Sequence, residues 1–190
     1  MEETGNEPEL AHKLREALGH VVQAAANVES DLRTVTAALL ETKYGAVVVA
    51  GQSANWLIET IQALIKVHDR VDDQKRDELK GVLTRIKQAF EERNRLAHGV
   101  WGTGVDGAIM SHTSKLRRID WQQSPVTLDS MNTTASELLN LSSGLYAWMF
   151  GTLPPEAITT EAQLRWEAYV RSLSPEELAT LAERRQHGTT

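Results

Sequence analysis

Long stripes of apolar residues constrain this chain more than any other feature. In three stretches, apolar residues recur at alternating steps of three and four, which is the spacing of one buried face of an α-helix. These stretches run from Leu14 to Leu39, from Leu79 to Ala97 and from Leu128 to Met149. The first follows a heptad seam, which predicts lengthwise packing against a near-antiparallel partner. The sequence therefore predicts an all-α, up-and-down helical bundle.

Shorter segments complete this bundle. Residues 46–50 are apolar and β-branched, so they fit either a strand or the first turns of a buried helix; without a companion strand nearby, we favour a helix or an extended connection. The next stretch carries its apolar residues on one helical face, and Asp69 to Arg76 is a charged linker. Val105-Asp106-Gly107-Ala108 is a tight-turn signal, which predicts a small β-hairpin insertion from Val100-Trp101 to Ile109-Met110.

Composition shifts divide the chain into three parts. We expect a flexible tail over residues 1–8, a helical bundle over 9–152 and a C-terminal helical appendage over 153–190. The boundary is Gly151-Thr152-Leu153-Pro154-Pro155, a run of helix-breaking residues. Ser174-Pro175-Glu176-Glu177 combines an N-cap, a first-turn proline and a capping-box glutamate. The appendage is therefore predicted to be a helical hairpin, with helices near 160–172 and 175–186.

Several classes of function are excluded by residues that the chain lacks. It has no cysteine, which removes disulfides, thiol nucleophiles and thiolate metal sites. The histidines outside the central motif are scattered without ligand spacing, and no phosphate-binding or dinucleotide-binding glycine motif occurs, so we expect no metal and no cofactor. No run approaches the length of a membrane span, and the acidic start is unlike a secretory signal. These features predict a soluble, cytoplasmic protein with no membrane partner.

Basic residues are concentrated in one part of an acidic chain. The formal net charge is −6, which argues against a general nucleic-acid coat. Between residues 80 and 118, however, only Glu91, Glu92 and Asp106 oppose a larger basic set: Lys80, Arg85, Lys87, Arg93, Arg95, Lys115, Arg117 and Arg118. A local patch of this kind fits a site that binds a few phosphates. The alternative is a solvated helix face and turn.

The second apolar stripe ends in a polar cluster, within Glu92 to Trp101. Arg93 lies three residues after Phe90 and four before Ala97, among core-facing positions, where a guanidinium is costly unless an anion or acceptor meets it. Asn94 and His98 are four residues apart and share one helical face. Gly99 is expected to end the helix in the left-handed conformation.

Glu29 in the first stripe admits two interpretations. Its flank of the helix is usually the rim of a core, where a carboxylate faces water. Alternatively, Glu29 is the acidic partner that holds Arg93. The same ambiguity applies to the motif itself, because Arg93 could be a structural arginine and His98 a helix-terminal residue that favours the helix dipole.

The string Arg93-Asn94-x-x-x-His98, at the end of an amphipathic helix in a helical chain, resembles the motif of the HEPN superfamily of prokaryotic toxins and RNA-cleaving defence proteins. With Leu96, Gly99 and Trp101 it is similar to one HEPN-like branch of bacterial genomes. The resemblance covers roughly residues 10–150. It implies a HEPN-like bundle and a metal-independent endoribonuclease in toxin–antitoxin or phage-defence biology, with RNA as substrate and an antitoxin protein as partner. It also implies a two-fold homodimer that brings two motifs to one cleft.

The residue types suit that chemistry. Histidine can act as base or acid because its unperturbed pKa, ~6.5, lies near neutral pH, and arginine presents a fixed cationic fork to phosphate. We therefore take Arg93, Asn94 and His98 as catalytic candidates, with Glu29, Arg95 and Trp101 in support and Lys115, Arg117 and Arg118 as RNA-binding residues. Trp101 and Trp121 could be core aromatics or a base-stacking surface. The alternative function is a non-catalytic module that binds nucleotide, RNA or protein.

Overall fold

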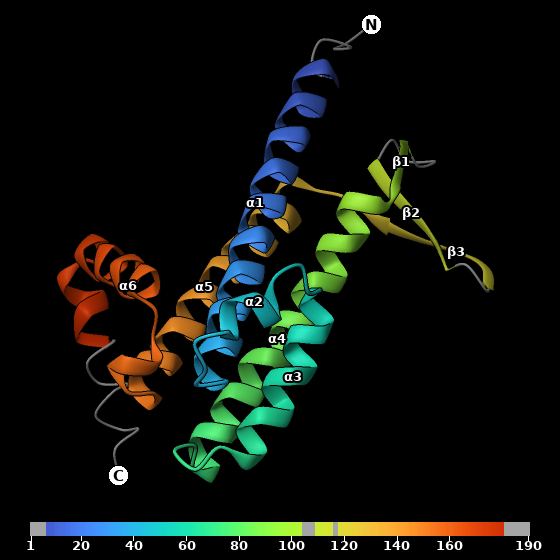
Figure 1. Ribbon diagram of the computed structural model, residues 1–190. Coiled ribbons are helices and arrows are strands. Elements are labelled where there is room, and N and C mark those ends of the chain that lie inside the picture. Colours follow the sequence, from blue (N-terminus) through green and yellow to red (C-terminus); the bar gives the residue numbers. More distant parts are fainter. Residues whose placement is uncertain (1–6, 104–108, 116–117, 181–190) are drawn as a thin grey trace, which may run out of the picture. The chain divides into compact units, whose positions relative to one another are not determined.

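The computed structural model describes residues 7–103, 109–115 and 118–180, and over these the chain is mainly helical (Figure 1). The elements in order are α1 (Glu7–Leu39), α2 (Gly45–Val49), α3 (Ala54–Val67), α4 (Asp73–His98), β1 (Val100–Thr103), β2 (Ile109–Lys115), β3 (Arg118–Pro125), α5 (Leu128–Thr152), a 3₁₀ turn (Pro155–Ala157) and α6 (Thr160–Ser172). Residues 175–180 are also helical. None of these helices is both long and apolar enough to cross a membrane.

The chain divides into two compact units. One holds residues 1–27 and 86–140, and the other holds residues 28–85 and 141–190. Helices α1, α4 and α5 therefore each contribute one segment to each unit. The first unit also contains the three strands, and the second contains α2, α3 and α6.

The three predicted apolar stripes are the buried faces of α1, α4 and α5. Almost every position named by the three-and-four spacing is buried; the α1 set is Leu14, Val21, Ala25, Val28, Leu32, Val35 and Leu39, the α4 set is Leu79, Leu83, Ile86, Ala89, Phe90 and Leu96, and the α5 set is Met131, Ala135, Leu138, Leu141, Leu145 and Met149. The prediction of a helical protein is thus confirmed for this part of the chain.

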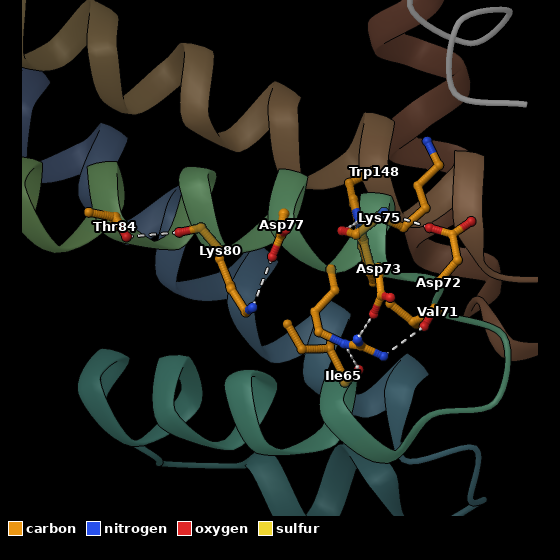
Figure 2. A network of polar contacts seen from close by, with 10 residues as sticks. Ile65, Val71, Asp72, Asp73, Lys75, Asp77, Lys80, Thr84 and Trp148 are labelled. Atoms are coloured by element: carbon orange, nitrogen blue, oxygen red, sulfur yellow. Dashed lines mark hydrogen bonds and ion pairs between the residues drawn. The ribbon is translucent and has the colours of Figure 1, made fainter. Parts of the chain in front are cut away.

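The start of α4 differs from the expectation. The prediction of a charged linker through Arg76 was wrong, because the helix already begins at Asp73. The Asp72 carboxylate accepts a hydrogen bond from the Lys75 amide at 2.7 Å, which caps the new helix. Arg76 then donates to the carbonyl oxygens of Ile65 at 2.9 Å and Val71 at 3.2 Å (Figure 2). The charged residues thus start α4 and tie it to the end of α3.

Within the second unit, a part-buried hydrogen bond and a close backbone approach join neighbouring helices. The Trp148 indole of α5 donates to the Lys75 carbonyl of α4 at 2.8 Å. A Cβ atom at Gly45 would lie 2.9 Å from the Ala37 carbonyl oxygen, so only glycine lets α2 approach α1 this closely. Residues 45–49 are therefore a short helix packed on α1, which decides between the two conformations that their sequence allowed.

The predicted C-terminal helices begin where the capping residues indicate. The Thr159 hydroxyl accepts from the Ala162 amide at the start of α6. Ser174 and Glu177 form the predicted reciprocal capping box, with the Glu177 carboxylate 2.7 Å from the Ser174 amide. Trp166 of α6 stacks on Phe150 of α5 at a centroid distance of 5.1 Å. The predicted end of the last helix, residues 181–186, lies outside the described residues.

The strands of the first unit form a three-stranded antiparallel sheet in the order β1-β2-β3. Val100 pairs with His112 and Thr103 with Ile109. In the second pairing, Met110 faces Pro125, and the register shifts between Ser114 and Lys115. The sequence predicted a hairpin of two strands, and the structure has a third strand, β3, beside them. The turn predicted at residues 105–108 lies outside the described residues.

Candidate functional site

The Arg93–His98 motif occupies the last turn and a half of α4, in the first unit. The Gly99 amide donates to the Arg95 carbonyl at 3.1 Å, and β1 begins at the next residue. Gly99 was expected in the left-handed conformation, but of the glycines that the structure describes only Gly51 has a positive φ. That expectation was wrong because the chain leaves the helix directly into an extended strand.

Arg93 is half-buried, and its guanidinium is only partly satisfied. Nη1 donates to the Asn94 side-chain oxygen at 2.9 Å. Nε is fully buried and has no hydrogen-bond partner among the described residues. A buried donor without an acceptor costs about 1–3 kcal/mol. The apolar pattern predicted that a guanidinium would be costly at this position. The described residues supply an acceptor for Nη1 of Arg93 but none for Nε.

A polar face, half-buried at Lys87 and exposed from Glu91 onward, runs along α4 to the motif. Its members recur at steps of four, three and four: Lys87, Glu91, Asn94 and His98. Asn94 and His98 are both exposed, as the shared-face spacing predicted, and so is Glu91. Lys87 and Glu91 were not predicted as members of this face, although the same helical spacing that joins Asn94 to His98 includes them.

Arg95 braces the junction between α4 and the sheet. Its guanidinium forms two hydrogen bonds to the Glu92 carboxylate one turn earlier, one of them 2.8 Å long. Nη1 lies 3.5 Å from the Pro125 carbonyl at the end of β3. The hydrogen bond with Glu92 raises the pKa of Arg95. The positive charge of Arg95 is therefore already matched by a carboxylate.

Trp101 folds back onto the end of the same helix. Its indole Nε1 donates to the Leu96 carbonyl at 3.0 Å, and the side chain is half-buried. The last carbonyls of a helix lack partners within the helix, so this bond satisfies one of them. Of the two roles considered for Trp101, the contact favours a packed aromatic residue that fixes β1 against α4.

Glu29 forms an ion pair with Arg33, one turn further along α1, with 3.5 Å between the charged atoms. Glu29 belongs to the second unit and Arg93 to the first. Pairing of Glu29 with Arg93 therefore stays a prediction.

The candidate RNA-binding residues lie where β2 meets β3. Lys115 ends β2 and faces Arg118, the first residue of β3. Arg117 lies between them, outside the described residues. Trp121 is paired through its backbone with Ser114. Binding of RNA by these residues stays a prediction.

The site as described offers a small set of chemical groups. One chain provides one imidazole, one side-chain amide and one incompletely paired guanidinium at the end of α4. Within the described ranges, no three histidine, aspartate or glutamate side chains gather where they could hold a metal ion. The groups that can bind an anion or move a proton are therefore Arg93, Asn94 and His98, with Glu91 beside them.

No protein-family model, curated protein or solved structure matches this chain.

Proposed function

We propose that this protein is a HEPN-type, metal-independent endoribonuclease of the cytoplasm, with its chemistry at the end of α4. The observation that carries the proposal is the buried, unpartnered Nε of Arg93 beside two exposed polar side chains, Asn94 and His98. Unsatisfied buried groups are rare in proteins and are often associated with function. The motif resemblance to HEPN proteins supports the same assignment.

In the proposed reaction, the ribose 2′-oxygen attacks the adjacent phosphorus while the bond to the 5′-oxygen breaks. His98 takes the 2′-hydroxyl proton or gives one to the departing oxygen, because imidazole exchanges protons near neutral pH. Arg93 stabilises the charge that builds on the non-bridging oxygens. Asn94 donates to a phosphate oxygen or orients His98. Lys115, Arg117 and Arg118 bind flanking phosphates.

The proposed active form is a homodimer, because the motif of a single chain offers one imidazole for two proton transfers. A two-fold axis would supply the second His98, and such isologous pairs are the commonest oligomers. The biological setting that we propose is toxin–antitoxin or phage-defence biology, with an antitoxin protein as the partner that holds the nuclease inactive.

The test is cleavage of a labelled RNA in the presence of a chelator. We expect His98→Ala to abolish cleavage, because no other group of the motif can exchange a proton. The matched control is His20→Ala, which removes an exposed histidine from α1 and should leave cleavage unchanged. Full activity of well-folded His98→Ala protein would rule out this chemistry.

Expression in a bacterial host tests the toxin role separately. We expect the wild-type protein to arrest growth and Arg93→Ala to relieve the arrest at equal protein level. Unaffected growth with the wild-type chain would count against the toxin role and would leave the cleavage assay to judge the nuclease.

A non-catalytic module that binds nucleotide, RNA or protein is the second candidate. The observation that favours it is that both supporting residues of the motif, Arg95 and Trp101, are engaged inside the chain. RNA binding without cleavage, weakened equally by Arg93→Ala and His98→Ala, would support this function.

A further inference from the structure

Helix α3 has two apolar faces. Leu57, Ile58, Ile61 and Ile65 form the buried one, each at most 1% exposed. The other consists of Trp56, Thr60, Ala63, Leu64 and Val67, which fall within an arc of roughly 100° at 3.6 residues per turn. This second face adjoins the buried one, and a helix that is apolar over so wide an arc is normally covered over most of it. The second face, here named the α3 stripe, therefore calls for a partner.

The α3 stripe is partly open and slightly hollow, with Trp56, Thr60 and Leu64 half-buried. The residues of the stripe and Glu59 line a shallow hollow of about 520 Å³, and all of them belong to α3. Val67, at one end, is 77% exposed, and Ala63 in the middle is also exposed. Large side chains at the two ends and small ones between them produce the hollow.

The pattern of the stripe is complementary to itself when the direction of the helix is reversed. A two-fold axis between Thr60 and Ala63 places Thr60 of one copy on Ala63 of the other. The same axis places Trp56 on Val67. The small residues in the centre allow two backbones to approach closely, and the large residues then pack at either end.

Charge gives the same direction of pairing. Glu59 and Lys66 lie on one edge of the stripe, within roughly 20° of each other around the helix. In an antiparallel pair, the same edges of the two helices meet, and Glu59 falls within about 3 Å along the axis of Lys66 in the second copy, at 1.5 Å of rise per residue. This contact occurs twice by symmetry. A parallel pair would instead set this edge against the apolar opposite edge.

We propose that the α3 stripe binds the α3 stripe of a second copy of this chain, antiparallel, with Thr60 and Ala63 at the two-fold axis. One helix against one helix is smaller than the usual interface of about 1,600 Å², so the dimer is weak and depends on concentration. The proposal does not depend on nuclease activity, because the assembly forms without RNA.

Sedimentation of the full chain over a range of concentrations tests the interface. We expect reversible dimerisation, weakened at least tenfold by Ala63→Glu, which puts a charge at the centre of the contact. Ala26→Glu is the matched control, since it makes the same change at an exposed position of α1. Glu59→Lys should also weaken the dimer, and adding Lys66→Glu should restore it. A monomer at all concentrations, or a dimer indifferent to Ala63→Glu, would overturn the proposal.

Disulfide cross-linking tests the direction of pairing. The chain has no cysteine of its own, so every disulfide must involve an introduced cysteine. A mixture of Thr60→Cys and Ala63→Cys proteins should form a mixed disulfide on mild oxidation. Val67→Cys alone should not, because an antiparallel pair separates the two copies of residue 67 by about 16 Å along the axis. Efficient Val67→Cys cross-linking without the mixed product would show a parallel contact and refute the proposed pairing.

Discussion

Arg93 combines a buried, unsatisfied donor with a place in the proposed catalytic motif. Its Nε is buried without an acceptor, although Nη1 is bound to Asn94. A phosphate oxygen could supply the charge and acceptors that the described chain does not, once the guanidinium turns toward it. A substitution at Arg93 should therefore affect both the proposed chemistry and the stability of the protein.

Replacing Arg93 with leucine should separate stability from function. We expect the free energy of unfolding to stay the same or rise by up to about 1 kcal/mol, because an apolar side chain removes the unsatisfied donor. RNA cleavage should be lost. Chemical denaturation and the cleavage assay measure the two effects on the same preparation. A destabilisation above about 2 kcal/mol would mark Arg93 as a structural arginine.

Asp31 is the buried acid of the second unit, at 3% exposure on α1. The Ser142 hydroxyl of α5 donates to its carboxylate, and Arg165 of α6 lies 4.0 Å away. Burial raises the pKa of Asp31, against the opposing effects of Ser142, Tyr146 and Arg165. The folded state thus holds this proton more tightly than the unfolded state does.

The stability of the protein should therefore depend on pH through Asp31. Below the ordinary aspartate pKa of about 4, Asp31 is protonated in both the folded and the unfolded state, so it adds no pH dependence to the free energy of unfolding. As the pH rises through the raised pKa, the unfolded state loses its proton first, and the free energy of unfolding falls. We expect the wild type to lose stability relative to Asp31→Asn over this window, measured by denaturation at each pH. A difference that does not vary with pH would contradict the assignment.

At the scale of elements, the junction between α4 and the sheet positions the motif. Trp101 binds the Leu96 carbonyl, and Arg95 reaches from Glu92 toward the end of β3. Both contacts hold the chain on either side of His98. The backbone that carries His98 is thus flanked by two contacts within the chain.

Trp101→Phe tests this positioning role. The change keeps an aromatic ring but removes the indole donor, and we expect a loss of about 1 kcal/mol of stability. The catalytic rate should fall while the apparent affinity for RNA stays the same, because the proposed mechanism does not use the Trp101 ring to bind RNA. Rate and apparent affinity for RNA are measured together. A selective loss of affinity with an unchanged rate would favour base stacking by Trp101 instead.

Sequence periodicity predicted the helices well because burial imposes it directly. The stripes of α1, α4 and α5 lie on the buried faces, and Thr127 and Ser174 begin helices as their types suggest. The start of α4 was not predictable from apolar spacing, since Asp72 and Arg76 stabilise it through hydrogen bonds. Strand β3 was missed because only its first half, Arg118 to Trp121, alternates polar and apolar types, and the rest up to Pro125 is polar and ends in proline.

The candidate site was predictable in part. The shared exposed face of Asn94 and His98 follows from four-residue spacing, and so does the half-buried setting of Arg93. The engagement of Trp101 and Arg95 within the chain could not be predicted, because it depends on where the strands leave the helix. The expected left-handed Gly99 failed for the same reason.

At the scale of the whole molecule, two separate surfaces carry the two proposals. The first unit carries the motif and the strands, and the second carries the α3 stripe. Cleavage assays address the first surface, and sedimentation and cross-linking address the second. A monomer at all concentrations would contradict both proposals, because the nuclease is also proposed to be a homodimer. A dimer that is indifferent to Ala63→Glu would overturn the α3 pairing alone, and RNA cleavage by His98→Ala protein would overturn the nuclease alone.

The most direct test of the central claim is the chemistry of the RNA ends after cleavage in a chelator. Attack by the 2′-oxygen predicts a 2′,3′-cyclic phosphate on one product and a 5′-hydroxyl on the other. A substrate with a single 2′-deoxyribose at the cleaved position should resist the wild-type protein, and His98→Ala should cleave neither substrate. Products with a 5′-phosphate, or cleavage of the 2′-deoxy substrate, would contradict the mechanism.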